Sequence, residues 1–470
     1  MPFNSFSFFI FLIVILFCAN LLHRYGSIQK FVLLVSCYYF YGQWGWPYCA
    51  LIFTTTTVDF IVARKIFRGY RPRFMLASSF VVQLGILFTF KYFNFFVNTT
   101  NELWRFWGCS GHINPLPILL PIGISFYTFK SLSYVVDVYR GDIEPRRSFL
   151  DYALYVSFFA HLAAGPIARA KNFFEQLQAR TKPSFFDVQQ AMGFILFGLV
   201  KKMAIADKLA TMANPVFDSP ATMDPYATLI GVYAFTFQIY FDFSGYSDIA
   251  IGVSKLFGIN LPKNFDSPYL STSFQEFWRR WHISLSTWLR DYLYIGIGGS
   301  RAGKWQTAWN TMVTMLLGGL WHGASWNFVL WGGLHGSYII IERWLKSLWP
   351  AFWNSRSHAS LLIRFLVTFN VVAFTWIFFR SPSLDNTIQI LHNLAGALRL
   401  DPGQSPTAII PYVFLFLALL YLHWFSNRLN WQERLKSLPG PTIVAAYSVA
   451  LILLVIFHAD ISAPFIYFKF

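Results

Sequence analysis

Two histidines, His322 and His335, lie in the most apolar third of the chain, within the string LLGGLWHGASWNFVLWGGLHG. A neutral imidazole can accept a proton from a hydroxyl group near neutral pH, so histidine is the commonest general base in enzymes. The surrounding glycines allow a backbone or a ligand to approach closely, and the tryptophans provide a large apolar wall. The string is compatible with a catalytic base or with two structural histidines.

A second polar cluster occupies residues 238–248, QIYFDFSGYSD, inside another long apolar stretch. Its carboxylates Asp242 and Asp248 and its hydroxyl groups, including that of Tyr240, need partners or a function, because unpaired polar groups are costly in apolar surroundings. The cluster therefore predicts either part of a site or a polar network that holds helices together. The string LPIGISFYTF at 120–129 has small and hydroxyl residues at the entrance of an apolar segment, and we interpret it as structural.

Residues 258–306 are rich in charge and tryptophan although apolar segments flank them on both sides. Ser271 or Ser273 could cap a helix that runs to about residue 293, with Glu276 in its first turn. Aromatic and leucine residues recur at three- and four-residue spacing and form one apolar face of this helix. A polar stripe lies on it at Arg279, His282, Ser286 and Arg290. From periodicity alone, the alternative is an interfacial amphipathic helix whose arginines reach the lipid headgroups.

The elements that must position these residues are apolar helices. Of 470 residues, 56% are hydrophobic and only 12% are charged, which is about half the charged share of a typical soluble domain. Disorder, fibrous repeats and a disulfide scaffold are excluded by this composition, and the four cysteines have no metal-binding or paired spacing. The chain is predicted to be an all-α polytopic membrane protein, and its N-terminal apolar run a retained first span.

About a dozen apolar segments are candidate spans, at 6–22, 29–42, 48–63, 74–97, 117–138, 186–205, 226–257, 307–320, 325–341, 361–379, 408–425 and 441–458. The stretch 151–166 is short and interrupted by glycine and proline, so a re-entrant element is expected there. The net charge of +16 is interpreted as lysines and arginines in cytoplasmic loops that orient the helices, rather than as a surface that binds nucleic acid. The basic loops 64–73 and 428–436 should face the cytoplasm, and the nearly neutral segment 382–407 should face the opposite side.

Several long strings carry a resemblance to a known family. They are KYFNFF, LPIGISFYTF, DVYRGD, HLAAGPIAR, YFDFSGYSDIAIG, FWRRWHISLSTWLRDYLYI, LLGGLWHGASW and the C-terminal PFIYFKF. In this order they resemble the membrane-bound O-acyltransferase (MBOAT) family, and more closely its bacterial branch that O-acetylates alginate and related exopolysaccharides. The resemblance covers nearly the whole chain, from Tyr38 to Phe470.

The resemblance implies a fold and a pair of site residues. The fold is a ring of about 11–12 transmembrane helices, with re-entrant and interfacial helices, around a thinned catalytic centre. The whole chain, 1–470, would form one integral membrane domain, with N-terminal spans in 1–115, the catalytic core in 116–345 and C-terminal spans in 346–470. The family's signature histidine corresponds to His322, and its second signature position falls on His282.

The resemblance also implies a reaction. A thioester such as acetyl-CoA is already activated, so the protein needs only a base for the acceptor hydroxyl and donors for the oxyanion. His322 suits the role of base, and His282, Tyr240 or Asn327 could orient it or stabilise the oxyanion, with Asp242 and His335 as further candidates. The cations Arg279, Arg280, Arg290 and Lys304 could bind the phosphates of coenzyme A, or anionic lipid. We expect no bound cofactor and no metal.

The expected location is the bacterial inner membrane, with the acetyl group coming from cytoplasmic acetyl-CoA. The expected partners are a polysaccharide acceptor, membrane lipid and a periplasmic O-acetyltransferase that completes the transfer to the polymer, which is expected to be alginate. Two alternatives remain at this point. One is a transporter or flippase for a lipid or polysaccharide, in which Asp242 and Asp248 would couple to protons. The other is D-alanyl transfer to teichoic acid, a reaction within the same family.

Overall fold

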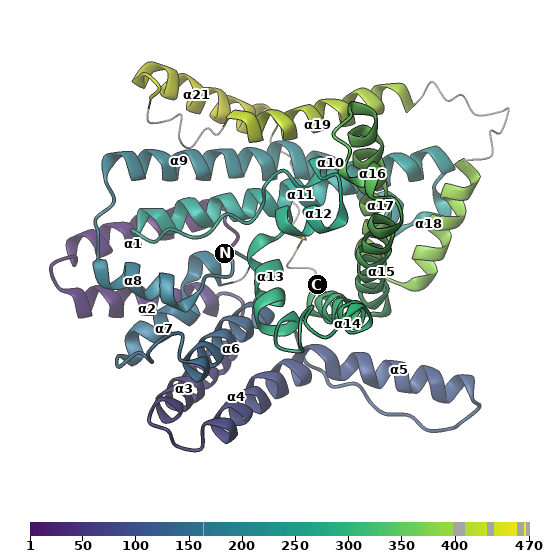
Figure 1. Ribbon diagram of the computed structural model, residues 1–470. Helices are drawn as coiled ribbons and strands as arrows, with labels where there is room; N and C mark the ends of the chain where they lie inside the picture. Colours follow the sequence, from purple (N-terminus) through teal and green to yellow (C-terminus); the bar gives the residue numbers. More distant parts are fainter. Residues whose placement is uncertain (163, 398–408, 430–436, 458–464, 467–470) are drawn as a thin grey trace. The chain divides into compact units, whose positions relative to one another are not determined.

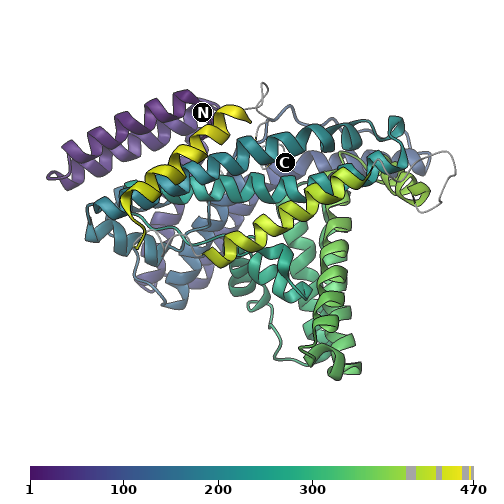
Figure 2. The same cartoon turned by 90° about the horizontal axis from the view of Figure 1, so that it is seen from above.

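The computed structural model describes residues 1–162, 164–397, 409–429, 437–457 and 465–466. Every regular element in these ranges is a helix, as Figures 1 and 2 show from two directions. The predicted all-α fold class is therefore confirmed. Residues 398–408 and 430–436, for which the sequence predicts a side of the membrane, and most of the C-terminal string PFIYFKF lie outside the described residues.

The chain divides into two compact units, which are described separately. The first unit contains residues 1–192 and 249–262. Its helices are α1 (Phe6–Leu21), α2 (Gly26–Gly42), α3 (Trp46–Phe67), α4 (Pro72–Leu87), α5 (Phe93–Phe106), α6 (Ile124–Arg140), α7 (Phe149–Ser157) and α8 (Ala170–Ala179). Helices α1 and α2 pack as an antiparallel pair, drawn in purple in Figure 2. The five-residue π turn η1 (Phe88–Tyr92) joins α4 to α5 without a break.

The second unit contains residues 193–248 and 263–470, and it carries every candidate site residue named above. Helices α9 (Phe185–Leu199) and α11 (Pro225–Leu256) run across the boundary between the units. The unit's other helices are α10 (Asp207–Asp218), α12 (Phe274–Arg280), α13 (Ile283–Trp288), α14 (Lys304–His322), α15 (Trp326–Leu348), α16 (Pro350–Asn354), α17 (His358–Arg380), α18 (Leu384–Ala397), α19 (Ile410–Leu429) and α21 (Gly440–Ile456). The expected subdivision of the chain at residues 115 and 345 stays a prediction.

Three continuous helical segments in the described part of the chain are long and apolar enough to cross a membrane. They are Pro72–Phe106, Phe185–Asp218 and His358–Arg380, and three shorter apolar helices lie at Phe6–Leu21, Ile410–Phe425 and Gly440–Ile456. Apolar side chains are exposed along these helices, as expected of surfaces that contact lipid rather than water. The chain is an all-α polytopic membrane protein. Its full count of about a dozen spans stays a prediction.

Two predicted elements differ from the structure. The helix expected to run from Ser271 or Ser273 to about residue 293 is broken, because Trp281 is extended and His282 adopts a left-handed backbone conformation (φ 41°). Periodicity cannot reveal such a break, since the side chains on either side of it keep their apolar spacing. Helix α18 occupies residues 384–397 of the nearly neutral segment 382–407, which contains none of the expected spans. The stretch 151–166 contains most of the short helix α7 and a buried 3₁₀ turn at Phe159–His161, and the re-entrant element expected there stays a prediction.

Candidate active site

Helices α14 and α15 form a tightly closed hairpin, and glycines make its close packing possible. A Cβ atom at Gly319 would lie 2.2 Å from the carbonyl oxygen of Phe328. A Cβ atom at Gly332 would lie 2.3 Å from the carbonyl oxygen of Met315 on the facing helix. Real carbon atoms do not approach backbone oxygens this closely, so the glycines serve contact between the two backbones. The hairpin fixes the position of His322, which is the last residue of α14.

We expect Gly332→Ala to destabilise the protein and reduce its activity, because the added methyl group must push α14 and α15 apart. Overpacking of this kind costs about 1–3 kcal/mol. Gly333→Ala is the matched control, since its methyl group would meet only the Leu316 side chain at 3.5 Å, an ordinary contact. Thermal unfolding of the two purified variants checks the prediction. Equal melting temperatures of the two variants would show that the hairpin accommodates the methyl group at position 332 without strain.

His322 lies in an aromatic enclosure and is only 6% exposed. Its ring centroid lies 5.0 Å from that of Trp321, 5.1 Å from that of Trp331 and 5.1 Å from that of Phe379. The chain turns directly after it, at Gly323, where any side chain would collide with the ring of Phe328. The surrounding rings exclude water from much of the imidazole, which strengthens any electrostatic interaction that it makes with a substrate.

His282 lies beside His322, with 6.4 Å between the two ring centroids. It is fully buried, and its ring packs edge-on against Phe243 at 4.7 Å. At this separation, two facing imidazole nitrogens could both reach one oxygen atom through hydrogen bonds of about 2.8 Å. The structure therefore brings together the two histidines that are 40 positions apart in the sequence.

The strained backbone at His282 is held by Asn264, a residue that the sequence analysis did not single out. The carbonyl oxygen of Asn264 accepts a hydrogen bond from the Ile283 amide at 2.9 Å. Its side-chain oxygen accepts hydrogen bonds from the amide and hydroxyl groups of Ser284, at 3.2 and 2.9 Å, and its amide nitrogen donates to the Ser247 hydroxyl at 3.3 Å. A left-handed conformation costs a non-glycine residue free energy, so such contacts are needed to maintain it.

Burial lowers the pKa of His282 to about 3. The imidazole is therefore neutral at physiological pH, and it can donate one hydrogen bond and accept another. In the unfolded chain a histidine has a pKa of about 6.5. The unfolded chain thus binds more protons between these two values, and the stability that neutral His282 contributes above pH ~6.5 is lost as the pH falls toward 3.

Substitutions at His282 should separate the role of its side chain from that of its backbone. We expect His282→Asn to retain more activity than His282→Ala, because asparagine keeps a hydrogen-bonding group and also tolerates the left-handed region. His282→Gly is the control, since it relieves backbone strain but supplies no side chain. If the imidazole acts on substrate, the glycine variant loses activity as the alanine variant does. Normal activity of the glycine variant would show that the His282 side chain is not needed and that only its backbone conformation matters.

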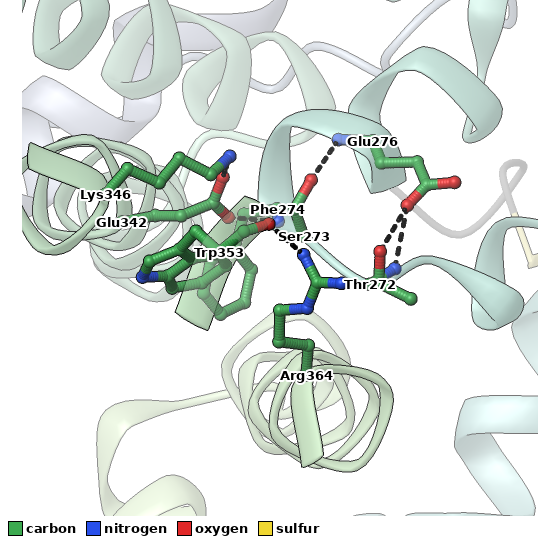
Figure 3. Close-up of polar contacts among 8 residues, drawn as sticks. All are labelled: Thr272, Ser273, Phe274, Glu276, Glu342, Lys346, Trp353 and Arg364. Carbon is green, nitrogen blue, oxygen red and sulfur yellow. Dashed lines mark hydrogen bonds and ion pairs between the residues drawn. The ribbon is translucent and has the colours of Figure 1, made fainter. Parts of the chain in front are cut away.

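The start of α12 is fastened to α15 by a buried carboxylate, as Figure 3 shows. Glu342 Oε2 accepts a hydrogen bond from the Phe274 amide at 2.5 Å, and its Oε1 accepts one from Lys346 at 2.5 Å. The predicted cap at Ser273 is confirmed, since its hydroxyl accepts a hydrogen bond from the Glu276 amide at 3.0 Å. These contacts satisfy amide groups that a helix start leaves free. They fix the helix whose far end leads into His282.

The other candidates near the histidines have structural partners. Asn327 donates a hydrogen bond to the Ser381 carbonyl at 2.9 Å and accepts one from Thr387 at 3.3 Å. His335 bonds Thr375 at 3.0 Å, with its ring 4.7 Å from that of Trp331. Both residues therefore hold α15 against the segment that begins with α17.

Tyr240 and Asp242 lie on α11, in different surroundings. The Tyr240 ring packs against those of His423 and Trp281, at 4.4 and 6.4 Å, so it touches the residue that precedes His282. Asp242 forms an ion pair of 2.6 Å with Lys202. The second carboxylate, Asp248, pairs with Lys201 at 2.6 Å. The alternative of a polar network that joins helices therefore fits the carboxylates of this cluster.

The four candidate cations for donor phosphates are dispersed over two segments. Arg279 and Arg280 lie at the end of α12 next to His282, and Arg280 pairs with Glu276 at 2.7 Å. Arg290 is exposed and pairs with Asp291 at 2.7 Å. Lys304 is exposed at the first position of α14. In the described part of the chain, no three His, Cys, Asp or Glu side chains lie together as metal ligands would.

Comparison with known proteins identifies the family. The family model described as MBOAT, membrane-bound O-acyltransferase family, matches residues 143–380, a range that contains both histidines. The chain belongs to the membrane-bound O-acyltransferase family. This O-acyltransferase is 40% identical over 383 residues to a probable alginate O-acetylase AlgI of Azotobacter vinelandii. The aligned region covers 80% of this chain and 74% of the relative.

Two further relatives support the assignment. A probable alginate O-acetylase AlgI of Pseudomonas putida is 36% identical over 475 residues and covers 94% of both chains. A peptidoglycan O-acetyltransferase of Helicobacter pylori is 34% identical over 399 residues, with 78% of this O-acyltransferase and 74% of the relative covered. Family and relatives together identify the chain as a membrane O-acetyltransferase, and the expected resemblance is confirmed.

Proposed function

We propose that this protein transfers an acetyl group from cytoplasmic acetyl-CoA, with His322 as the general base. The observation that carries the proposal is the contact between buried His322 and buried His282 in one compact unit of an O-acetyltransferase. Both rings are buried, so neither is a solvent-exposed surface histidine. Among the described residues, neither lies in a cluster that could hold a metal. An apolar enclosure that contains two imidazoles suits proton transfer away from water.

In the proposed step, His322 takes the proton from an acceptor hydroxyl while the oxygen attacks the thioester carbonyl carbon. A new C–O bond forms, the C–S bond breaks, and coenzyme A leaves as a thiolate that recovers the proton from the His322 imidazolium. The neutral imidazole of His282 donates a hydrogen bond to the oxyanion or orients the hydroxyl. The cations Arg279 and Arg280, at the end of α12 just before His282, would attract the donor's phosphates.

The acceptor is proposed to be an exopolysaccharide, with alginate first because two of the relatives above are named as alginate O-acetylases. The protein would lie in the bacterial inner membrane and pass the acetyl group to a periplasmic acetyltransferase. Residues 382–407 contain two aspartates and one arginine, so this segment does not attract a polyanion. A separate periplasmic partner would therefore bind the polymer.

Reconstitution tests the donor, the acceptor and the relay together. The full chain is placed alone in lipid vesicles, with labelled acetyl-CoA on the cytoplasmic side and alginate on the other side. We expect labelled alginate only after a periplasmic acetyltransferase is added. Efficient labelling of alginate by the chain alone would exclude the relay, and no consumption of acetyl-CoA even with the partner would exclude the donor.

A further inference from the structure

A small basic pocket lies in the first unit, on elements that the proposed reaction does not use. It is formed by the ends of α1 and α8, the first turns of α2 and the residues that follow α11. Its volume is about 60 Å³. One water needs about 10–15 Å³ measured in this way, so the pocket can hold several waters or one tetrahedral phosphate group.

The charged and titratable side chains that line the pocket are basic. His23, Lys30, Arg180 and Lys182 line it, and no acidic side chain does so among the described residues. Lys30 is neutralised by Asp151 at 2.7 Å, and Asp151 is not among the residues that line the pocket. Burial, and then the nearby charges of Lys182 and Arg180, lower the pKa of His23, so these cations lie close enough to repel a further positive charge. An anion would relieve this repulsion.

Arg180 is held in the pocket by a hydrogen bond to a backbone carbonyl and by packing on a glycine. Its backbone is left-handed (φ 47°), directly after the last residue of α8. Its guanidinium donates a hydrogen bond to the carbonyl oxygen of His23 and packs on Gly26, where a Cβ atom would lie 2.4 Å from Nη1. Its Nε is buried and has no hydrogen-bond partner among the described residues. The guanidinium is therefore positioned yet keeps donors for a ligand.

Part of the remaining lining is apolar, beside the neutral polar residues Asn20, Gln29, Gln176 and Thr181, and it adjoins surfaces that lipid would cover. Leu16, Leu33 and Phe257 line its wall. On the same helices, Phe17 and Leu21 of α1 are 68% and 67% exposed, and Ile28 of α2 is 52% exposed. Exposed apolar side chains along candidate membrane helices contact acyl chains. A ligand that fits both parts has a phosphate group joined to an apolar chain.

We propose that this pocket binds the phosphate headgroup of an anionic phospholipid, whose acyl chains lie along α1 and α2. The phosphate pairs with Arg180, Lys182 and the His23 side chain, and the glycine at position 26 leaves room for the guanidinium. The site is independent of the acetyl-transfer chemistry, because its residues belong to the first unit and the two catalytic histidines belong to the second. Coenzyme A and inorganic phosphate carry the same anionic group as this phospholipid, but they lack its acyl chains.

Lipid titration of the purified full chain in detergent tests the site. Native mass spectrometry counts bound phosphatidylglycerol, with phosphatidylcholine, coenzyme A and inorganic phosphate as separate arms. We expect one tightly bound phosphatidylglycerol, and a loss of about 30-fold in its affinity in the double variant Arg180→Gln, Lys182→Gln, since each cation contributes about fivefold near an anionic headgroup. Arg68→Gln with Arg73→Gln, two exposed cations of the same unit, is the matched control and should bind as the wild type does.

A second variant tests the geometry without changing charge. Gly26→Ala should displace the flexible end of Arg180 and weaken phosphatidylglycerol binding with little loss of stability, whereas Gly85→Ala, with open space around its Cβ position, should change neither. Unchanged phosphatidylglycerol affinity in both the double variant and Gly26→Ala would overturn the site. Equal binding of phosphatidylcholine, or displacement of phosphatidylglycerol by coenzyme A or inorganic phosphate, would overturn the assignment to an anionic lipid.

Discussion

His322→Gln is expected to abolish acetyl transfer while leaving the protein folded and inserted in the membrane. Glutamine fills much of the space of the imidazole among Trp321, Trp331 and Phe379 and keeps a hydrogen-bonding group, but it cannot accept a proton at neutral pH. A general base typically contributes on the order of 10²–10⁴-fold to the rate. The release of free coenzyme A by the purified protein, with its partner and acceptor present, measures the loss.

Two histidine variants serve as controls for this result. His392→Gln changes an exposed histidine of α18 and should leave the rate unaltered. His335→Leu removes the hydrogen bond to Thr375 and should lower the melting temperature more than the rate per folded molecule. If His322→Gln turned over at a rate near that of the wild type, the base would have to be another residue, and the assignment of His322 would fail.

Sequence patterns predicted the helices well where a cap or a charge marks the boundary. Ser273 caps α12 as expected, and α3 ends within the basic segment 64–73, with Arg64 and Lys65 in its last turn. The positions of the apolar segments likewise correspond to α1, α14 and α17 within three residues, whereas α15 continues seven residues beyond its predicted end at 341. These features are local, so they can be recognised without knowledge of the packing.

The break at His282 could not be recognised in the same way. Its left-handed backbone is stabilised by Asn264, 18 positions earlier, and the aromatic spacing continues through the break without interruption. The role of the glycines in the α14–α15 hairpin was similarly open, since glycine permits close approach of either a ligand or a backbone. The distances at Gly319 and Gly332 decide for the backbone.

Long-range charge pairs were also invisible to sequence patterns. Asp242 was a candidate site residue because it lies in an apolar segment, which is a sound reason to suspect function. Its partner Lys202 lies 40 positions away, in the π turn η3 (Val200–Ala206). This turn directs two successive lysines to α11, where Lys201 meets Asp248 and Lys202 meets Asp242. No local signal predicts which lysine a buried carboxylate will meet.

The geometry of this second cluster predicts the largest effect on stability. Lys202 Nζ lies 2.6 Å from Asp242 and 2.8 Å from Asp207, and its side chain is 1% exposed. Asp242 also accepts a hydrogen bond from the Ile466 amide at 2.8 Å, and the Lys202 ammonium lies 4.7 Å from the centre of the Phe465 ring. One buried lysine thus balances two buried carboxylates and helps to hold a segment near the C-terminus.

Lys202→Met is therefore expected to cost about 3–5 kcal/mol of unfolding free energy, because it removes the cation that lies within ion-pair distance of two buried carboxylates. Lys201→Met, the same substitution one residue earlier, should cost less, because Lys201 pairs with the single carboxylate of Asp248 and the two side chains are only partly buried, at 25% and 21% exposed. Thermal unfolding and the yield of folded protein in detergent compare the two variants directly.

A triple variant then distinguishes loss of the charge balance from loss of the lysine's packing. Adding Asp207→Asn and Asp242→Asn to Lys202→Met removes the two carboxylate charges that Lys202 balanced and should restore most of the lost stability, since the cost arises from buried charge that has lost its cation rather than from the ion pair itself. If Lys202→Met proved as stable as Lys201→Met, the cluster would contribute nothing beyond a single partly buried pair. If the triple variant stayed as unstable as the single one, the lysine's aliphatic packing and its contact with Phe465 would be the stabilising feature instead.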